Sequence, residues 1–323
     1  MFSIQTYNPE YFNVWNDFVV ASKNATFLFN RNFMEYHKDR FNDFSLLVFK
    51  GEKLVAILPA NTVEDRVYSH QGLTYGGLVF KENLKLNTVL LIFRALLKYL
   101  SDAQVKELQL KMLPYIYNAL PNDEQSYIMF LLEATLIRRD ALSVIDYRKA
   151  LKFSKDRLEG VKRGKKHGLL IKEEDSFESF WTTVLEPNLN EKHNVKPVHS
   201  LAEITALNTY FGKQIRQFNV YQNNQIIAGA TIFESKYVAH SQYISGNSQK
   251  NELGSLDFLH HHLITSVFNN KRFFDFGVSN VNNGRQVNQG LQYWKEGFGA
   301  RTVTQDFYTV DTSSYKILDT VLI

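Results

Sequence analysis

The sequence of 323 residues contains no cysteine. The absence of thiols excludes disulfide bonds, thiolate metal sites and a cysteine nucleophile, and it fits a reducing compartment. No apolar run approaches the roughly 20 residues that a membrane-spanning helix needs, because the best candidate, residues 89–100, is interrupted by Arg94 and Lys98. Residues 1–15 have neither a basic start nor a continuous apolar run. We therefore expect no signal peptide and predict a cytoplasmic protein.

An excess of charge of either sign is also absent. The formal net charge is only +4, so the electrostatics of the whole molecule do not demand a nucleic-acid partner. The apolar content of 44% and the aromatic content of 14% are enough to fill hydrophobic cores. A chain of this length is too long for one ordinary domain and short for three, so two domains are expected.

A pattern of strands occurs twice along the chain. Residues 44–58 predict a β-hairpin with its turn at Lys50-Gly51, and residues 218–233 repeat this arrangement around Asn223-Asn224. Each hairpin is followed by a third run, at residues 66–70 and 236–240. The recurrence favours a duplicated unit that mixes strands and helices, an α/β (mixed α+β) fold.

Helical segments are predicted at equivalent places in the two halves. Residues 88–101 place apolar side chains at helical spacing, and residues 255–268 occupy the same position later, with Ser255 as a plausible N-cap. A change from an apolar strand to a basic stretch suggests a boundary within residues 146–153. We therefore predict domains at 1–150 and 151–323.

The basic stretch runs from Arg148 to His167 and contains more cations than local acids can pair. One interpretation is a solvated surface helix. The other is a patch that faces phosphate groups of a ligand such as CoA, a nucleotide sugar or RNA. The sequence leaves both open.

Two motifs near the C-terminus are the most informative part of the chain. Residues 273–277 read Phe-Phe-Asp-Phe-Gly, a buried strand, and residues 288–299 form a short helix that carries Lys295 and closes on Gly-Phe-Gly. This pattern resembles the last strand-helix unit of the GNAT acyltransferase fold in its FemABX-like branch, which reads F-D-F-G, N-x-G-L and K-x-x-F-G. The duplicated hairpins resemble the tandem arrangement of that branch, so the resemblance covers nearly the whole chain and implies two GNAT-like domains, each a mixed sheet flanked by helices.

The resemblance implies an N-acyltransferase that moves an acyl group, expected to be acetyl, from acyl-CoA to an amine of a sugar nucleotide or another cell-envelope precursor. Its donor would be acetyl-CoA or another acyl-CoA, without a metal. The first half would contribute the acceptor side and the second half the donor side. The alternatives are a FemABX-type aminoacyltransferase that uses aminoacyl-tRNA and a catalytically silent binding protein of this fold. A nucleic-acid-binding protein rests only on the basic stretch, and the oligomeric state stays open.

In the GNAT fold the reaction takes place in a slot between two parallel strands that splay apart. Here those strands would be residues 240–245 and 272–278. We expect the thioester near Tyr243, Ile244, Ser245 and Gly246, and the phosphates near Gly254 and Ser255, where the next helix offers free backbone N–H groups. The loop between them has one glycine where the GNAT pyrophosphate loop has two.

The last predicted helix carries two competing candidates. At about 100° per residue, Asn288 and Lys295 share one face beside an apolar stripe, and Tyr293 points more than about 120° away from Lys295. The family resemblance implies that Lys295 steadies negative charge on the donor side, with Asn288 beside it, whereas Tyr293 corresponds to the general GNAT tyrosine that protonates the thiolate. We rank Lys295 first. A lysine at the flank of the stripe would carry little packing, so its removal should hardly change stability.

Two further residues of the slot strands are candidates. His240 could act as a base or serve a structural role, and Asp275 could orient the acceptor or accept a structural hydrogen bond. The run His260-His261-His262 is not a metal motif, because consecutive side chains on a helix diverge by about 100° each.

Overall fold

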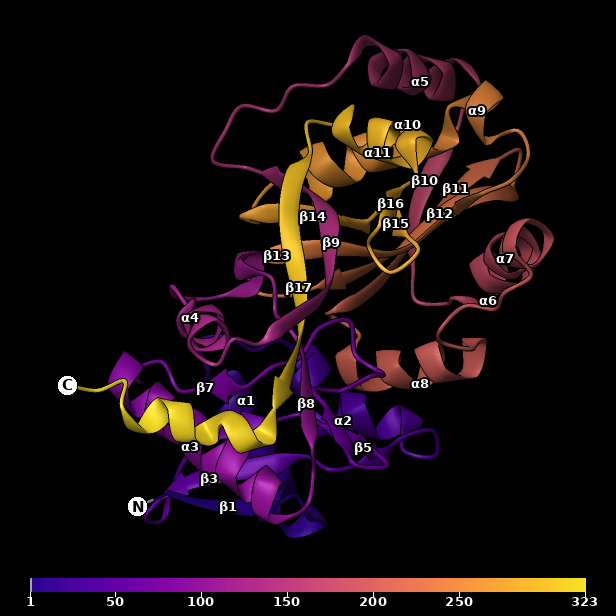
Figure 1. Ribbon diagram of the computed structural model, residues 1–323. Coiled ribbons are helices and arrows are strands. Elements are labelled where there is room, and N and C mark those ends of the chain that lie inside the picture. The colour runs from indigo at the N-terminus through magenta and orange to yellow at the C-terminus, as the bar shows by residue number, and fades with distance from the viewer. Residues whose placement is uncertain (1) are drawn as a thin grey trace. The chain divides into compact units, whose positions relative to one another are not determined.

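The computed structural model describes residues 2–323 (Figure 1). The chain forms two compact units: residues 2–140, Asn283–Arg285 and Thr304–Ile323 make the first, and Ala141–Asn282 with Gln286–Val303 make the second. The change from the first unit to the second falls inside strand β9 (Thr135–Asp146). It therefore lies before the expected boundary region, residues 146–153, and no loop or change of composition marks it.

The first unit contains two groups of paired strands. β1 (Phe2–Thr6), β3 (Leu46–Lys50), β4 (Lys53–Leu58) and β7 (Val79–Phe80) pair in the order β1-β3-β4-β7. The other group runs β17-β8-β6-β5-β2, with bounds β2 (Asn42–Asp43), β5 (Asn61–Val63), β6 (Arg66–Tyr68), β8 (Glu107–Lys111) and β17 (Arg301–Asp311). β6 and β8 pair in parallel.

Helices cover these strands. They are α1 (Phe12–Val20), α2 (Arg31–Met34), α3 (Leu86–Asp102) and α4 (Glu124–Leu131), with 3-10 turns at η1 (Pro9–Tyr11), η2 (Phe27–Phe29), η3 (Glu35–His37), η4 (Tyr115–Tyr117) and η7 (Thr312–Asp319). The α3 side chains spaced for one helical face are buried, including Val89, Ile92 and Phe93. They form one hydrophobic core with β3, β4 and β8, as the helical pattern predicted.

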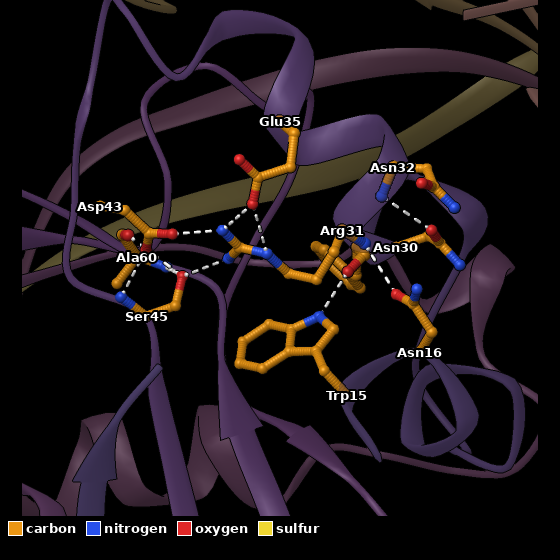
Figure 2. A network of polar contacts seen from close by, with 10 residues as sticks. Trp15, Asn16, Asn30, Arg31, Asn32, Glu35, Asp43, Ser45 and Ala60 are labelled. Atoms are coloured by element: carbon orange, nitrogen blue, oxygen red, sulfur yellow. Dashed lines mark hydrogen bonds and ion pairs between the residues drawn. The ribbon is translucent and has the colours of Figure 1, made fainter. Parts of the chain in front are cut away.

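A buried arginine joins the N-terminal helices to strands of the first unit (Figure 2). The guanidinium of Arg31, which is 3% exposed, donates to Glu35 Oε1 and Asp43 Oδ2, and its Nη1 donates to Ser45 Oγ at 3.2 Å. It also lies 3.7 Å from the centre of the Tyr7 ring. Burial raises the pKa of Asp43, but Arg31 and hydrogen bonds from Ser45 outweigh it and hold that pKa below its usual value. This buried charge is therefore well compensated.

The second unit is built on a mixed sheet in the order β10-β11-β12-β13-β14-β9. Its strands are β10 (Leu170–Glu174), β11 (Ile215–Gln222), β12 (Gln225–Glu234), β13 (Val238–Gly246), β14 (Phe273–Val278) and the latter part of β9, with a small pair formed by β15 (Asn280–Val281) and β16 (Gln286–Val287). The β11–β12 turn has positive φ at Asn223 and Asn224. That conformation is the one for which asparagine is favoured in tight hairpins, so the predicted turn is confirmed.

Helices of the second unit are α5 (Lys155–Lys166), α6 (Glu178–Phe180), α7 (Glu186–His193), α8 (Leu201–Phe211), α9 (Lys250–Leu253), α10 (Ser255–His262) and α11 (Gln289–Glu296), with π-helical turns at η5 (Trp181–Leu185) and η6 (Leu263–Val267). Figure 1 shows α5, α10 and α11 gathered together. The predicted N-cap at Ser255 is wrong, because Gly254 caps α10 with φ +66° and Ser255 is its first residue.

The two repeats have the same order of elements, so the predicted duplicated α/β fold is confirmed. In each, antiparallel strands lead to a strand (β6 or β13), a helix (α3 or α10), a strand parallel to the first (β8 or β14), a short helix (α4 or α11) and a final strand. The final strands are exchanged: β9 follows α4 but pairs with β14, and β17 follows α11 but pairs with β8. This exchange explains why the last residues belong to the first unit.

Candidate active site

Strands β13 and β14 separate where the sequence predicted a slot. Their parallel ladder pairs Val238 with Phe273 and ends at the pair of His240 and Asp275. Beyond that pair, β13 continues beside β12 as far as Gly246, whereas β14 continues along β9 through an irregularity between Asp275 and Val278. The two strands thus stop pairing with each other after His240 and Asp275.

The irregularity in β14 depends on a glycine. Gly277 has φ +68°, a left-handed conformation that residues with a Cβ adopt only with strain. A Cβ on Gly277 would also lie 3.3 Å from His240 Cε1, closer than most van der Waals contacts. The backbone of this bulge therefore fits against the imidazole of His240.

His240 and Asp275 form a hydrogen-bonded pair at the last rung of the ladder. His240 Nδ1 lies 2.9 Å from Asp275 Oδ2, and the other oxygen, Oδ1, accepts the backbone N–H of Gly277 at 2.7 Å. Asp275 is fully buried, and His240 is slightly exposed. Because an ionised carboxylate can only accept, it holds the imidazole proton on Nδ1 and leaves Nε2 with a free lone pair. Such an imidazole can accept a proton from a nucleophile.

Lys295 lies under the bulge of β14. Its side chain is only 2% exposed, and Nζ donates to Gly277 O at 3.0 Å and to Val278 O at 2.7 Å. Burial lowers the pKa of Lys295 to about 8, and the charge of Asp275 opposes that shift. Its removal would leave two carbonyl groups without their donor, so the expectation of an unchanged stability is corrected. The helical pattern showed which face carried Lys295 but not that the bulge covers it.

Tyr293 is on a different side of the same helix. Its side chain is 60% exposed, and its hydroxyl donates to Asp156 Oδ2 at 2.6 Å. This hydrogen bond and the charge of Asp156 raise the pKa of Tyr293. The structure therefore separates Tyr293 from Lys295, as the helical angles predicted, and it turns the hydroxyl of Tyr293 toward α5.

A pocket of about 770 Å³ opens beside β13, between α5, α7, α10 and α11. Its volume lies within the range of ligand and cofactor pockets. Predicted site residues that line it are Ile244, Ser245, Asn288 and Tyr293. Asn288 caps α11 by accepting the backbone N–H of Leu291 at 3.0 Å. The second unit thus brings part of the predicted donor site to one concave surface.

Cations predominate among the charged groups of this pocket. Arg157, Arg163 and Lys250 line it together with one carboxylate, that of Asp257. Arg157 Nη1 and Trp294 Nε1 both donate to Asp257 Oδ1, at 2.7 and 2.8 Å. Burial raises the pKa of Asp257, and Arg157 opposes that shift. The Nε atom of Arg157 is buried without a hydrogen-bond partner, so this guanidinium retains capacity for an anion.

Other predicted donor residues are not among those that line the pocket. The hydroxyl of Tyr243 contacts His199, at 2.6 Å from Nδ1, and burial raises the pKa of Tyr243 to about 12. Gly246 O accepts Asn188 Nδ2 at 2.5 Å. Gly254 and Ser255 are buried, and a Cβ at Gly254 would clash with the carbonyl oxygen of Gly160 on α5. The backbone expected to receive phosphates is therefore covered by a neighbouring helix.

Sequence reasoning missed two groups of the pocket. Asp257 is a single acid in an apolar helix, and only its pairing with Arg157, which is distant in the chain, reveals a role. Asn188 lies on α7, outside every motif, and its Nδ2 donates to Ser245 Oγ at 2.7 Å. The basic stretch did contain a signal, since Arg157 and Arg163 come from it.

Neither a metal centre nor a membrane helix is found in residues 2–323. Among the side chains of residues 2–191 and 194–323, no three from His, Cys, Asp and Glu form a group that could hold an ion. None of the helices described there has the length and apolar character to cross a bilayer. His260 is buried, with Nδ1 2.9 Å from Leu256 O, and burial lowers its pKa to about 4.

Solved structures of similar fold extend over almost the whole chain. FemX has a TM-score of 0.65 at 10% sequence identity, with 94% of this chain and 96% of FemX covered. L-PGS from Bacillus licheniformis has a TM-score of 0.59 at 11% identity, with 96% and 94% covered. A tandem GNAT protein from the clavulanic acid biosynthesis pathway has a TM-score of 0.52 at 10% identity, with 97% and 99% covered. The sequence matches no protein-family model and no curated protein. The chain therefore has a GNAT-like fold of the FemABX type, as its motifs predicted.

Proposed function

We propose that this protein is an N-acyltransferase that moves an acyl group, expected to be acetyl, from acyl-CoA to an amine of a sugar nucleotide or another cell-envelope precursor. The observation that carries the proposal is the His240–Asp275 pair at the point where β13 and β14 separate. A base oriented by a carboxylate meets the need of amine acylation, in which the attacking nitrogen must lose a proton. The likeness to transferases of the same fold supports a transferase.

The donor would occupy the pocket beside β13. Arg157, Arg163 and Lys250 supply positive charge for phosphate groups, and one of them keeps a buried N–H without a partner. The thioester would lie near Ile244 and Ser245, where β13 runs away from β14. We propose the arginines for the phosphates in place of the backbone of Gly254 and Ser255, because that backbone is covered.

In the proposed reaction the nitrogen of the acceptor amine attacks the thioester carbonyl carbon. His240 Nε2 takes one proton from that nitrogen as the C–N bond forms. The C–S bond then breaks, and the imidazolium returns the proton to the departing sulfur, so that an amide and a thiol result. Asp275 stabilises the imidazolium, and the positive charge of Lys295 stabilises the negative charge that develops in the slot.

Tyr293 is the competing candidate for protonating the sulfur, because it lines the pocket whereas Lys295 does not. Its hydroxyl already donates to Asp156, so it would have to exchange this partner to act as an acid. We therefore keep Lys295 as the first choice. The cytoplasm is the proposed location, since a chain without cysteine fits a reducing compartment.

A FemABX-type aminoacyltransferase is the second candidate. Lys165 and Lys166 lie exposed on α5, the helix that supplies Arg157 and Arg163 to the pocket. A cationic surface that extends from the pocket would suit the backbone of an aminoacyl-tRNA. The same His240–Asp275 pair would then deprotonate the amine while an ester bond, instead of a thioester bond, is broken.

Calorimetric titration with CoA, acetyl-CoA and an aminoacyl-tRNA tests the donor. We expect CoA and acetyl-CoA to bind. Arg163→Ala should weaken the affinity for CoA by about tenfold, because one charge-assisted contact of about 1.4 kcal/mol is lost. Lys162→Ala is the matched control, because Lys162 is the neighbouring residue, pairs with Glu159 and does not line the pocket. Binding of the tRNA alone, with a steep dependence on salt, would favour the second candidate. If none of the three ligands binds, the transferase proposal fails.

A further inference from the structure

The first unit repeats the separation of strands seen in the second. The parallel ladder of β6 and β8 pairs Arg66 with Glu107 and ends at the pair of Tyr68 and Gln109. Just beyond, Ser69 Oγ accepts the backbone N–H of Lys111 at 2.9 Å, so a side chain takes the place of the next backbone contact. Counted from the ladders, Tyr68 and Gln109 stand where His240 and Asp275 stand in the second unit, and His70 and Lys111 follow two residues beyond them.

A pocket of about 210 Å³ lies at this separation. Its walls are mostly apolar and aromatic and include Leu110, Ile137 and Phe307. His70 and Lys111 are the titratable nitrogen groups among its lining residues. Pockets that take drug-sized ligands usually have about 300–1,000 Å³, so this one would hold a smaller molecule.

The ammonium of Lys111 has no counter-ion among the residues that the structure describes. Its Nζ donates to the carbonyl oxygen of Leu73 and lies 5.9 Å from the centre of the Phe307 ring. One neutral acceptor leaves two of its three N–H donors without a protein partner. Burial and the nearby guanidinium of Arg138 lower the pKa of Lys111 to about 8. Desolvated cations are normally paired, so this group lacks an anion.

Neighbouring groups do not supply that anion. The carboxylate of Asp140 attracts Lys111 but is occupied by a two-point contact with Arg138, at 2.9 and 2.7 Å. His70 cannot serve either, because an imidazole is either neutral or cationic; burial and the adjacent His37 lower the pKa of His70 to about 3 and keep it neutral. The His37 and His70 rings are stacked, with centres 4.9 Å apart, so a second ring packs against the His70 ring that lines the pocket.

We propose that the pocket between β6 and β8 binds a small monocarboxylate with an apolar body. The carboxylate pairs with Lys111, and the apolar part packs against Phe307, Ile137 and Leu110. A neutral molecule of the same shape would leave the ammonium unpaired, so the site discriminates by charge. It is separate from the donor pocket and does not depend on the proposed acyl transfer.

Binding is measured on the whole protein with benzoate and hexanoate as probes and with benzamide and hexanamide as neutral counterparts. Thermal shift at millimolar concentration should detect the carboxylates and not the amides, because a ligand of the native state raises the melting temperature. Acetylation of Lys111 by an amine-reactive ester, followed by mass spectrometry, gives a second readout. Either carboxylate should slow that labelling at Lys111 and leave the labelling of Lys162 unchanged.

Two variants define the site. Lys111→Met should reduce carboxylate affinity by at least about tenfold, the loss of one charge-assisted contact. Ile137→Trp should also abolish binding by filling the pocket, and it should fold normally because Ile137 is 41% exposed. Leu136→Trp is the matched control: Leu136 is the preceding residue, is 39% exposed and does not line the pocket.

The outcomes are decisive. The proposal stands if carboxylates bind, amides do not, and only the Lys111 and Ile137 variants lose binding. It is overturned if neither carboxylate shifts the melting temperature or protects Lys111, or if Ile137→Trp binds as well as Leu136→Trp does. Displacement of benzoate by CoA would also overturn it, because the probe would then occupy the donor pocket.

Discussion

Asp275 and His240 are joined at the last rung of a parallel ladder, with 2.9 Å between Oδ2 and Nδ1. The carboxylate is fully buried, and the imidazole is 13% exposed at the point where the two strands stop pairing. This relationship fixes the orientation of the ring and leaves Nε2 as the atom available to a substrate. It also ties the proposed base to the backbone of β14, since the same carboxylate accepts the N–H of Gly277.

Replacement of either member of the pair should lower turnover without a matching loss of donor binding. His240→Gln removes the proposed base, and we expect kcat to fall by roughly 10²-fold or more, the usual contribution of general-base catalysis. Asp275→Asn should have a similar effect because an amide no longer holds the proton on Nδ1. Steady-state kinetics and CoA titration measure the two effects. His262→Gln on α10 is the control, and equal activity of His240→Gln and the parent would remove His240 from the mechanism.

Lys295 and Tyr293 can be separated by one pair of variants. Lys295→Met should lower kcat by about 10²-fold, typical for the loss of a group that stabilises developing charge. It should also lower stability, because Gly277 O and Val278 O lose their donor. Tyr293→Phe should keep most activity, since its hydroxyl is bound to Asp156. The reverse result, an active Lys295→Met and an inactive Tyr293→Phe, would assign the chemistry to the tyrosine.

The pKa of Lys295 predicts opposite trends of activity and stability with pH. With a pKa of about 8 in the folded protein, the ammonium is lost above that pH, and activity that needs it should fall about tenfold per unit further up. The unfolded-state value is about 10.4, so between these values the folded protein binds fewer protons and the contribution of Lys295 to stability rises with pH. Lys111, also with a pKa of about 8, acts in the same direction. A profile of kcat against pH, measured together with denaturant titrations at each pH, tests these opposite trends. Parallel losses of rate and stability with rising pH would contradict them.

Gly277 should tolerate no side chain. Gly277→Ala places a Cβ at a φ of +68° and against His240, so we expect a loss of about 1–3 kcal/mol in stability together with a loss of activity. Gly168→Ala is a matched control, because Gly168 has φ +65° and open space around its Cβ position. It should have the backbone strain without the effect on turnover. If both variants are equally active, the bulge does not position His240.

The local patterns of the sequence were sufficient to predict the repeated hairpins, the helix of residues 88–101 and the slot strands. Those features depend on turn residues and on spacing within one segment, such as Asn223-Asn224. The burial of Lys295 could not be predicted in this way, because Lys295 is on α11 and the carbonyl groups that cover it belong to a bulge in strand β14. The same reason hid the contact between Gly160 and Gly254, which closes the backbone where phosphates were expected. Contacts between distant segments are what the sequence alone left undetermined.

The exchange of final strands has a consequence for any attempt to divide the protein. A fragment cut near residue 150 would keep β9 but lose β17, so the edge of β8 would be left with unpaired N–H and C=O groups. The complementary fragment would lack β9, so β14 and its bulge at Gly277 would lose the strand with which they pair. Each piece on its own would be a template for aggregation, whereas the two expressed together could restore both pairings. Neither repeat is therefore suited to study as a separate fragment.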